Sequence, residues 1–156
     1  MRLTLLAVGR LRGGSLGTLL ADYAKRLESG PLGPLRVKEV EERRPLPPAA
    51  LKEREARLLL EALPRDARLI ALDESGRQLD SRGFAALLAR WRDEGVTETA
   101  FAIGGADGLA ETVKQEAHFT LSLGAMTWPH LLVRLLLAEQ LYRANAILQG
   151  HPYHRD

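Results

Sequence analysis

A chain of 156 residues is long enough to bury the core of one domain, and its 46% hydrophobic and 27% charged residues are ordinary for a globular protein. The absence of cysteine excludes disulfides, zinc–thiolate sites and thiol nucleophiles, and a net charge of +2 favours no class of partner. The longest apolar run stops at Arg134 and Glu139, far short of the roughly 18 residues of a membrane span. We therefore expect a cytoplasmic protein with no membrane segment.

Apolar runs of strand length alternate with helical patterns along the chain. The runs predict strands at Leu3–Val8, Leu35–Val40, Leu69–Leu72, Thr99–Ile103 and Phe119–Leu123. The segments between them predict helices near Leu16–Leu27, Ala49–Leu63, Ser81–Asp93, Leu109–Ala117 and Pro129–Leu148. Because the strands are apolar throughout rather than alternating, the pattern predicts an α/β domain whose mostly parallel sheet is covered by helices on both faces.

An acidic pair, Asp73 and Glu74, follows the predicted strand Leu69–Leu72 and precedes Gly76. The carboxyl ends of parallel strands are where α/β proteins bind ligands, so Asp73 is a candidate ligand contact. An Asp shortly before a glycine also begins many turns. Of the two interpretations, the turn is favoured.

A glycine turn, Gly104-Gly105-Ala106-Asp107-Gly108, follows one predicted strand and opens a predicted helix. Glycine permits close backbone approach to a ligand, and the free N–H groups of a helix start favour an acceptor-rich one. A tight turn would use the same residues, so both interpretations stay open. The dinucleotide fingerprint requires an acid about 20 residues later. The sequence has Leu123, Gly124 and Ala125 there, so an NAD-type oxidoreductase is disfavoured.

The predicted helix Pro129–Leu148 is apolar around nearly its whole circumference. Pro129 fits the first helical turn, with Thr127 or Trp128 before it as the cap. A helix without a polar face must be buried on all sides. One face packs on the sheet, and we expect a second copy of the chain to cover the other, which predicts a homodimer. The alternative is a helix wrapped by its own chain.

The chain ends on His151-Pro152-Tyr153-His154-Arg155-Asp156, a chemically rich segment at a position where chains usually fray. We expect this tail to be held in place, together with the irregular segments 103–108 and 121–129, around the last helix. His151 and His154 resemble a metal pair, but only Asp156 lies nearby, so no metal site is predicted. The chain has no G-x-S-x-G, P-loop or H-E-x-x-H motif, which leaves hydrolase and kinase chemistry without support.

Four segments resemble the ribosomal large-subunit methyltransferase H family, a single-domain branch of the SPOUT methyltransferases. They are Phe101–Leu109, Leu121–His130, Leu141-Tyr142-Arg143-Ala144 and His151–Arg155. The likeness extends over the whole chain and is weakest at residues 30–65. It implies one SPOUT domain over residues 1–156, with a C-terminal trefoil knot at roughly 70–150 and a tail, 151–156, that completes the substrate site.

The resemblance implies S-adenosylmethionine as the cofactor, with no metal. Gly105 and Gly124 would let backbone groups reach the cofactor, and Leu72 and Met126 would help to form an apolar wall for its adenine and methylthio groups. The full set of implied cofactor contacts is Leu72, Gly104, Gly105, Leu123, Gly124, Ala125, Met126, Thr127 and Trp128.

The implied reaction is methylation of N3 of a pseudouridine in helix 69 of large-subunit ribosomal RNA, carried out on the assembled 70S ribosome by a homodimer. Tyr153, His154 and Arg155 are the candidate catalytic residues, and the tail of one subunit is implied to complete the site of the other. Arg155 would clamp a phosphate or stabilise the deprotonated base, and His154 would take the proton.

Arginine makes up 18 of the 22 basic residues, and arginine is the side chain that forks onto phosphate. Solvated surface explains the same composition, so this signal alone decides nothing. The candidate contacts to the RNA backbone are Arg2, Arg10, Arg12, Lys25, Arg26, Arg134 and Arg143. Without the resemblance, the remaining alternative is a non-catalytic, ribosome-associated dimer that binds an adenine nucleotide.

Overall fold

The structure is a computed structural model that describes residues 1–155, so Asp156 lies outside the described residues. Five strands form one parallel sheet in the order β2-β1-β4-β3-β5. The strands are β1 (Arg2–Val8), β2 (Leu35–Val40), β3 (Arg68–Gln78), β4 (Glu98–Ile103) and β5 (Phe119–Ser122). The helices are α1 (Gly14–Arg26), α2 (Pro48–Glu61), α3 (Ser81–Asp93), α4 (Glu111–Glu116) and α5 (His130–Leu148). All ten predicted elements are confirmed, and the largest difference is in β3, which continues to Gln78.

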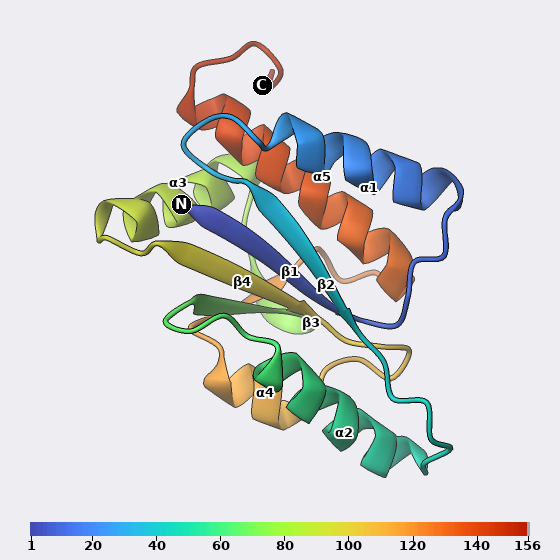
Figure 1. Cartoon of the computed structure of the whole chain (residues 1–156). Helices are drawn as coiled ribbons and strands as arrows, with labels where there is room; N and C mark the ends of the chain where they lie inside the picture. The colour runs from blue at the N-terminus through green and yellow to red at the C-terminus, as the bar shows by residue number, and fades with distance from the viewer. Residues whose placement is uncertain (156) are drawn as a thin grey trace.

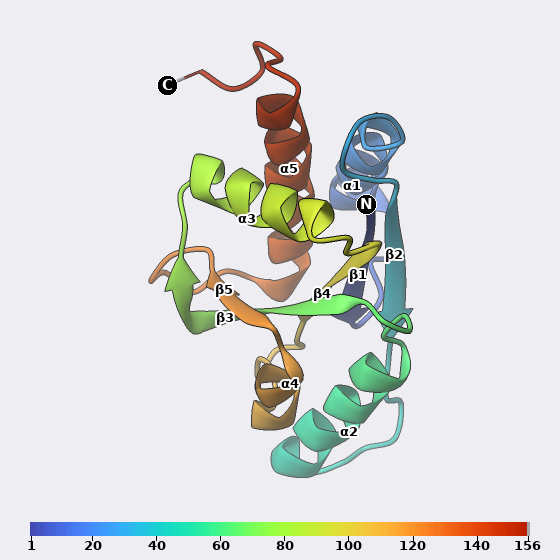
Figure 2. The same ribbon diagram turned by 90° about the vertical axis from the view of Figure 1, so that its left-hand side faces the viewer.

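Helices cover both faces of the sheet, with α1, α3 and α5 on one face and α2 and α4 on the other (Figure 1, Figure 2). Neighbouring side chains along a strand enter opposite layers, as strand geometry requires. Leu5 and Phe101 belong to the core beneath α1, α3 and α5. Leu6 and Ala100 belong to the core beneath α2 and α4. The predicted α/β sheet with helices on both faces is confirmed, whereas the trefoil knot stays a prediction.

Strand β2 lies at the edge of the sheet, and the prediction that every strand is apolar throughout is wrong for it. Residues 36–39 are exposed, while all of β4 in the interior of the sheet is buried. The strand pairs on one side only, with β1. Charged residues such as Arg36 and Lys38 on such an edge discourage pairing with another chain.

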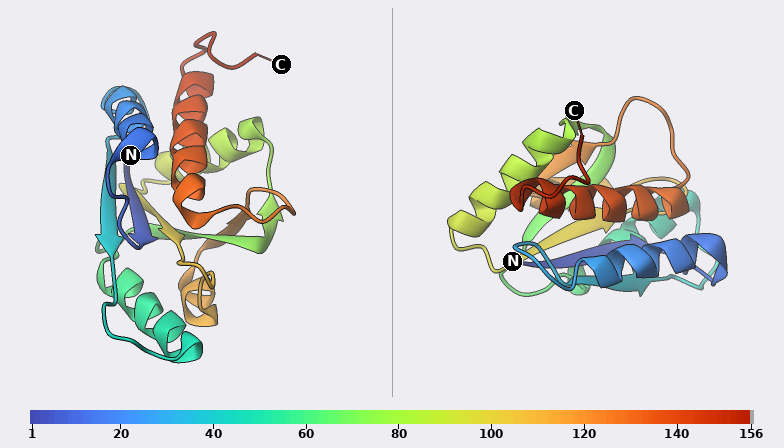
Figure 3. Two further views of the ribbon diagram at one scale, coloured as in Figure 1. Left: turned by 90° about the vertical axis from the view of Figure 1, so that its right-hand side faces the viewer. Right: turned by 90° about the horizontal axis from the view of Figure 1, so that it is seen from above.

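Helix α5 lies over the sheet between α1 and α3 (Figure 3). It begins at His130 with Pro129 as its N-cap, so the prediction that placed Pro129 inside the first turn, with Thr127 or Trp128 as cap, is wrong by about one residue. Every residue of α5 is buried or half-buried, which shows that the chain's own elements cover much of this helix. Four leucines near its start are only half-buried: Leu131, Leu132, Leu135 and Leu136.

Arg134 is fully buried and ties α5 to the carboxyl end of β1. Its Nη2 donates to the carbonyl oxygens of Val8 at 2.6 Å and Gly9 at 2.9 Å, and its Nη1 donates to Oε1 of Glu39 at 2.7 Å. Burial lowers the pKa of Arg134, while the Glu39 carboxylate opposes that effect. The expectation that Arg134 contacts RNA is wrong, because the side chain has no exposed surface and its donors serve the fold.

Replacing Arg134 with Met is expected to lower the free energy of unfolding by about 3 kcal/mol, because two buried carbonyls and a carboxylate lose their donor. Urea unfolding measures the change. Arg90→Met is the matched control, since Arg90 is exposed and its guanidinium pairs with Glu94 at 3.8 Å on the surface. That variant is expected to change stability by less than about 0.5 kcal/mol. Equal losses in the two variants would contradict the structural role of Arg134.

Candidate functional site

A cavity of about 920 Å³ opens at the carboxyl end of the sheet, beside β3, β4 and β5. Its walls come from residues 72–75 of β3, residues 103–109 after β4, and residues between 121 and 133 that lead from β5 into α5. Lys52 of α2 and Lys114 of α4 also line it. This edge is where parallel α/β sheets bind ligands. The three loops named by the sequence therefore meet at one cavity.

Eight of the nine predicted cofactor contacts line this cavity, and Ala125 is the exception. Ala125 is an exposed residue of the loop between β5 and α5 and does not line the cavity. The role of the eight as cofactor contacts stays a prediction. They are Leu72, Gly104, Gly105, Leu123, Gly124, Met126, Thr127 and Trp128.

The turn after β4 depends on very close backbone approach. The N–H of Gly108 donates to the carbonyl oxygen of Gly105 at 3.1 Å, and Gly108 has a φ of 75°. A Cβ on Gly104 would lie 2.4 Å from the carbonyl carbon of Gly108, so no larger residue fits there. A Cβ on Gly105 would lie 3.1 Å from a carboxylate oxygen of Glu55, which is tight but less severe. The tight turn is confirmed, and the same turn forms one wall of the cavity.

Asp73 begins a turn within β3, as the favoured interpretation predicts. Its Oδ1 accepts a hydrogen bond from the backbone N–H of Ser75 at 3.0 Å, and its Oδ2 lies 3.8 Å from Nζ of Lys114. Burial raises the pKa of Asp73, but the Ser75 hydrogen bonds and the Lys114 charge outweigh that effect and hold the pKa below its usual value. A Cβ on Gly76 would lie 2.8 Å from the backbone of Leu121, so glycine lets β3 and β5 approach closely beside the cavity.

The loop between β5 and α5 holds its shape by local hydrogen bonds and leaves apolar side chains exposed. Ser122 Oγ donates to the carbonyl of Gly124 at 3.1 Å and lies 3.2 Å from the N–H of Gly124, whose φ is 116°. Met126 is 73% exposed and Trp128 is 40% exposed. Large exposed apolar side chains beside a cavity mark a surface that binds a ligand or a partner.

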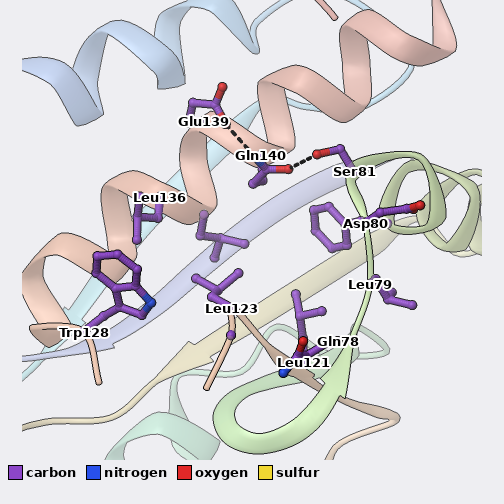
Figure 4. Close-up of a pocket in the computed structure, with 13 residues that line it drawn as sticks. Gln78, Leu79, Asp80, Ser81, Leu121, Leu123, Trp128, Leu136, Glu139 and Gln140 are labelled. Carbon is purple, nitrogen blue, oxygen red and sulfur yellow. Dashed lines mark hydrogen bonds between the residues drawn. The ribbon is translucent and has the colours of Figure 1, made fainter. Parts of the chain in front are cut away.

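A second cavity, of about 490 Å³, lies on the α5 side of the same loop (Figure 4). Figure 4 shows apolar side chains, including Leu123 and Trp128, on one part of its wall. A polar chain lines another part: Ser81 Oγ donates to Oε1 of Gln140 at 2.7 Å, and Gln140 Nε2 donates to Oε2 of Glu139 at 2.8 Å. Since Leu123 and Trp128 line both cavities, this loop forms the wall between them.

The tail packs against its own helices near the C-terminal end of α5. The Tyr153 hydroxyl donates to Oε1 of Glu139 at 3.1 Å and lies 3.4 Å from the hydroxyl of Tyr23. Its ring meets that of Tyr142 edge-on, with centroids 4.7 Å apart. Burial raises the pKa of Tyr153, and the neighbouring Tyr23 and Glu139 raise it further. These contacts suit Tyr153 to anchoring the tail as a hydrogen-bond donor.

The other two candidate catalytic residues also lie in the tail. His154 Nδ1 is 3.4 Å from Nη1 of Arg143, and Arg155 is exposed. The cavity is lined by residues no later in the chain than Val133. Arg143, which lies beside His154, is ten residues beyond Val133 along α5, about 15 Å at 1.5 Å per residue. The structure therefore separates the candidate catalytic residues from the cavity of the same chain.

Several of the candidate RNA contacts are paired with carboxylates. Ion pairs join Arg2 to Glu98 at 3.1 Å and Arg26 to Asp22 at 2.8 Å, and Arg143 pairs with Glu139. Arg10 lies 3.6 Å from Glu41. The remaining exposed basic residues of the predicted set are Arg12 and Lys25.

Among the cavity residues that the sequence did not assign to the site, Lys52, Lys114 and His130 carry titratable side chains. For the two lysines no local signal exists, because only the strand order brings α2 and α4 to this edge. His130 directly follows the predicted cofactor loop, and that adjacency was an available signal. Within residues 1–155 there is no group of three or more His, Asp or Glu side chains placed to hold a metal ion, and Asp156 lies outside this range. In the same range, each helix is too short or too polar to cross a membrane.

The comparisons with known proteins agree on one family. Residues 1–154 match the family model described as Predicted SPOUT methyltransferase. Proteins named Ribosomal RNA large subunit methyltransferase H from Paramagnetospirillum magneticum and Rhodospirillum centenum are 53% and 54% identical over 155 residues, and each alignment covers 99% of both chains. The crystal structure of a probable methyltransferase from Bordetella pertussis Tohama I shares the fold, with a TM-score of 0.58 and 20% identity over 92% of this chain and 95% of that one. The chain therefore belongs to the SPOUT methyltransferases and, within them, to the ribosomal RNA large subunit methyltransferase H family.

Proposed function

We propose that this protein transfers a methyl group from S-adenosylmethionine to N3 of a pseudouridine in helix 69 of large-subunit ribosomal RNA, acting on the assembled 70S ribosome. One structural observation carries the proposal: three loops distant in sequence meet at one cavity of about 920 Å³ at the carboxyl end of the sheet. That volume is in the range of pockets that hold cofactors. The identity to relatives named as ribosomal RNA methyltransferases supports the class of substrate.

The chemistry of the cavity fits a nucleoside cofactor that carries an amino-acid group. Leu72, Leu123 and Met126 offer an apolar wall to adenine. The turn at Gly104 and Gly105 brings backbone groups to the wall of the cavity. Lys114 and the acidic residues of the same wall provide charges of both signs for the amino and carboxylate groups. When bound, S-adenosylmethionine supplies a methyl group activated by its sulfonium.

The protein has two tasks in this reaction: to align N3 with the methyl group and to provide for the N3 proton. Alignment alone accounts for a large part of the rate of such a transfer. We assign Arg155 to an RNA phosphate or to the deprotonated base. His154 of the tail is one of two candidates for the proton, and His130 of the cavity wall is the other. Tyr153 is assigned to positioning, since its hydroxyl is bonded to Glu139 and its ring packs on Tyr142.

We also propose a homodimer in which each tail completes the cavity of the other subunit. In support, the tail packs near the C-terminal end of its own α5 and lines no part of the cavity of its own chain. Half-buried leucines at the start of α5 and the exposed Met126 and Trp128 give that copy an apolar surface to cover. We further propose one SPOUT domain over residues 1–156, with the knot in residues 70–150. RNA phosphates would be held by exposed basic residues such as Arg12 and Lys25, and this binding would weaken as salt rises.

The test incubates the protein with methyl-labelled S-adenosylmethionine and either 70S ribosomes, free 50S subunits or naked ribosomal RNA, all lacking the modification. The RNA is then digested and its nucleosides are separated. Label is expected in N3-methylpseudouridine, and most strongly with 70S ribosomes. Label in another nucleoside would contradict the proposed target. Cofactor binding with no transfer to any RNA would favour the non-catalytic dimer that binds an adenine nucleotide.

A further inference from the structure

His130 stands where the cavity meets the turn after β1. It is the first residue of α5, its ring is half-buried, and it is the one histidine among the described residues that line the cavity. Its Nε2 lies 3.9 Å from the position that a Cβ on Gly9 would take. Within residues 1–155 its ring makes no side-chain hydrogen bond, so a ring nitrogen is available to a ligand in the cavity.

The charges around His130 favour the neutral ring. Burial lowers the pKa of His130 below the ordinary 6.5, and the positive charge of Arg134 on the next turn of α5 lowers it further. The helix dipole acts in the same direction, because the first position of a helix disfavours a cation. Behind Arg134, Glu39 of β2 is engaged with that guanidinium. The other charged groups of the cavity wall are Lys52, Asp73, Glu74, Asp107 and Lys114.

The other groups of the cavity are poorly suited to accept a proton. Asp73 already accepts hydrogen bonds from Ser75 and faces Lys114, so its carboxylate is a weak base. The lysine side chains of the wall are cations. Within one chain His154 is remote from the cavity and lies beside Arg143. Among the described residues, His130 is the imidazole that lines the cavity, and no side-chain hydrogen bond within residues 1–155 occupies its ring.

We propose that His130 accepts the N3 proton of the target base during methyl transfer, an inference that rests on the proposed function. As the bond from N3 to the methyl carbon forms, the bond from sulfur to that carbon breaks and its electrons stay on sulfur. The N3–H electron pair stays on the base while the proton passes to the imidazole. The positive charge of the sulfonium thus ends on imidazolium, so charge and atoms balance.

The test compares wild type, His130→Gln and His154→Gln for single-turnover methyl transfer on 70S ribosomes between pH 5.5 and 9. Cofactor affinity is measured by calorimetry. The wild-type rate is expected to fall as the pH drops through the pKa of His130, because the protonated ring cannot accept a proton. At pH 7 the rate of His130→Gln is expected to be about 10²-fold below that of wild type, as removal of a general base predicts. The decrease in rate at low pH, the acid limb of the profile, is expected to disappear in this variant. Its cofactor affinity is expected to stay within a few-fold of wild type.

A chemical rescue separates proton transfer from a purely structural role. His130→Ala leaves space at the start of α5, and added imidazole is expected to restore part of its rate and none of the rate of His154→Gln. An unchanged rate and acid limb in His130→Gln would overturn the inference, as would loss of the acid limb in His154→Gln alone. Failure of imidazole to restore His130→Ala would also count against it. Absence of transfer by wild type would overturn the proposed function and this inference together.

Discussion

Removing residues 153–156 is expected to lower the rate of methyl transfer by about 10³-fold and to leave cofactor affinity within about twofold of wild type, as loss of positioning groups predicts. The deleted segment contains His154 and Arg155, which would contact the target nucleobase and the RNA phosphates. The segment does not line the cavity of its own chain, so the walls that would hold the cofactor stay intact. Single-turnover transfer on 70S ribosomes and calorimetry with S-adenosylmethionine measure the two effects separately.

Tyr153→Phe is the matched control for this truncation. It removes the hydroxyl that bonds to Glu139 and Tyr23 but keeps the ring against Tyr142. Because the anchor is weakened rather than lost, we expect a rate reduced by about fivefold, the equivalent of one hydrogen bond of roughly 1 kcal/mol. Normal turnover by the truncated protein would show that the tail has a structural role only.

The secondary structure was predictable because its signals are local. Each strand of the sheet interior is a short apolar run, and each run is separated from the next by a segment of helical pattern. The exposed side of β2 had a local signal that the prediction missed, because Arg36, Lys38 and Glu39 interrupt its apolar residues. Its position at the edge has no such signal, since it depends on the order of the strands. The bounds of β3 were missed for a related reason: its continuation to Gln78 depends on pairing with β5 across the register shift near Arg77.

Within the site, the sequence and its family resemblance identified the loops better than the single side chains. The glycines of the turn after β4 were identified because only glycine meets the close approach that the turn requires. Arg134 was assigned to the wrong class, since a buried arginine and an RNA-binding arginine look alike in sequence. Their difference lies in partners distant along the chain, here the carbonyls of Val8 and Gly9. Lys52 and Lys114 were missed for the same reason.

Gly104→Val is expected to weaken binding of S-adenosylmethionine by at least about 100-fold, the equivalent of roughly 3 kcal/mol. The first side-chain atom alone would lie 2.4 Å from the carbonyl carbon of Gly108, so the turn must open and one wall of the cavity moves with it. Gly105→Val is expected to weaken binding as well but less severely, since its nearest neighbours are the Glu55 side chain at 3.1 Å and Val8 at 3.2 Å. Calorimetry measures the affinity, and thermal unfolding checks that each variant is folded.

Gly108→Ala is the matched control in the same turn. Its φ of 75° makes alanine strained there, but no atom lies within 4 Å of the added Cβ. We therefore expect a cost of only about 1 to 2 kcal/mol in stability, and a far smaller loss of cofactor affinity than in Gly104→Val. Normal cofactor binding by a folded Gly104→Val protein would contradict the placement of the cofactor against this turn.

Mixing the two inactive variants decides how the site is assembled. The protein truncated after residue 152 keeps its cavity and lacks a tail, and Gly104→Val keeps its tail and lacks a competent cavity. If each tail serves the other subunit, a mixed dimer joins the intact cavity of one chain to the intact tail of the other, and methyl transfer returns after subunit exchange. If each tail served its own cavity, no mixed dimer would contain a complete site. We expect activity to return, because the tail packs near the C-terminal end of its own α5 and lines no part of its own cavity.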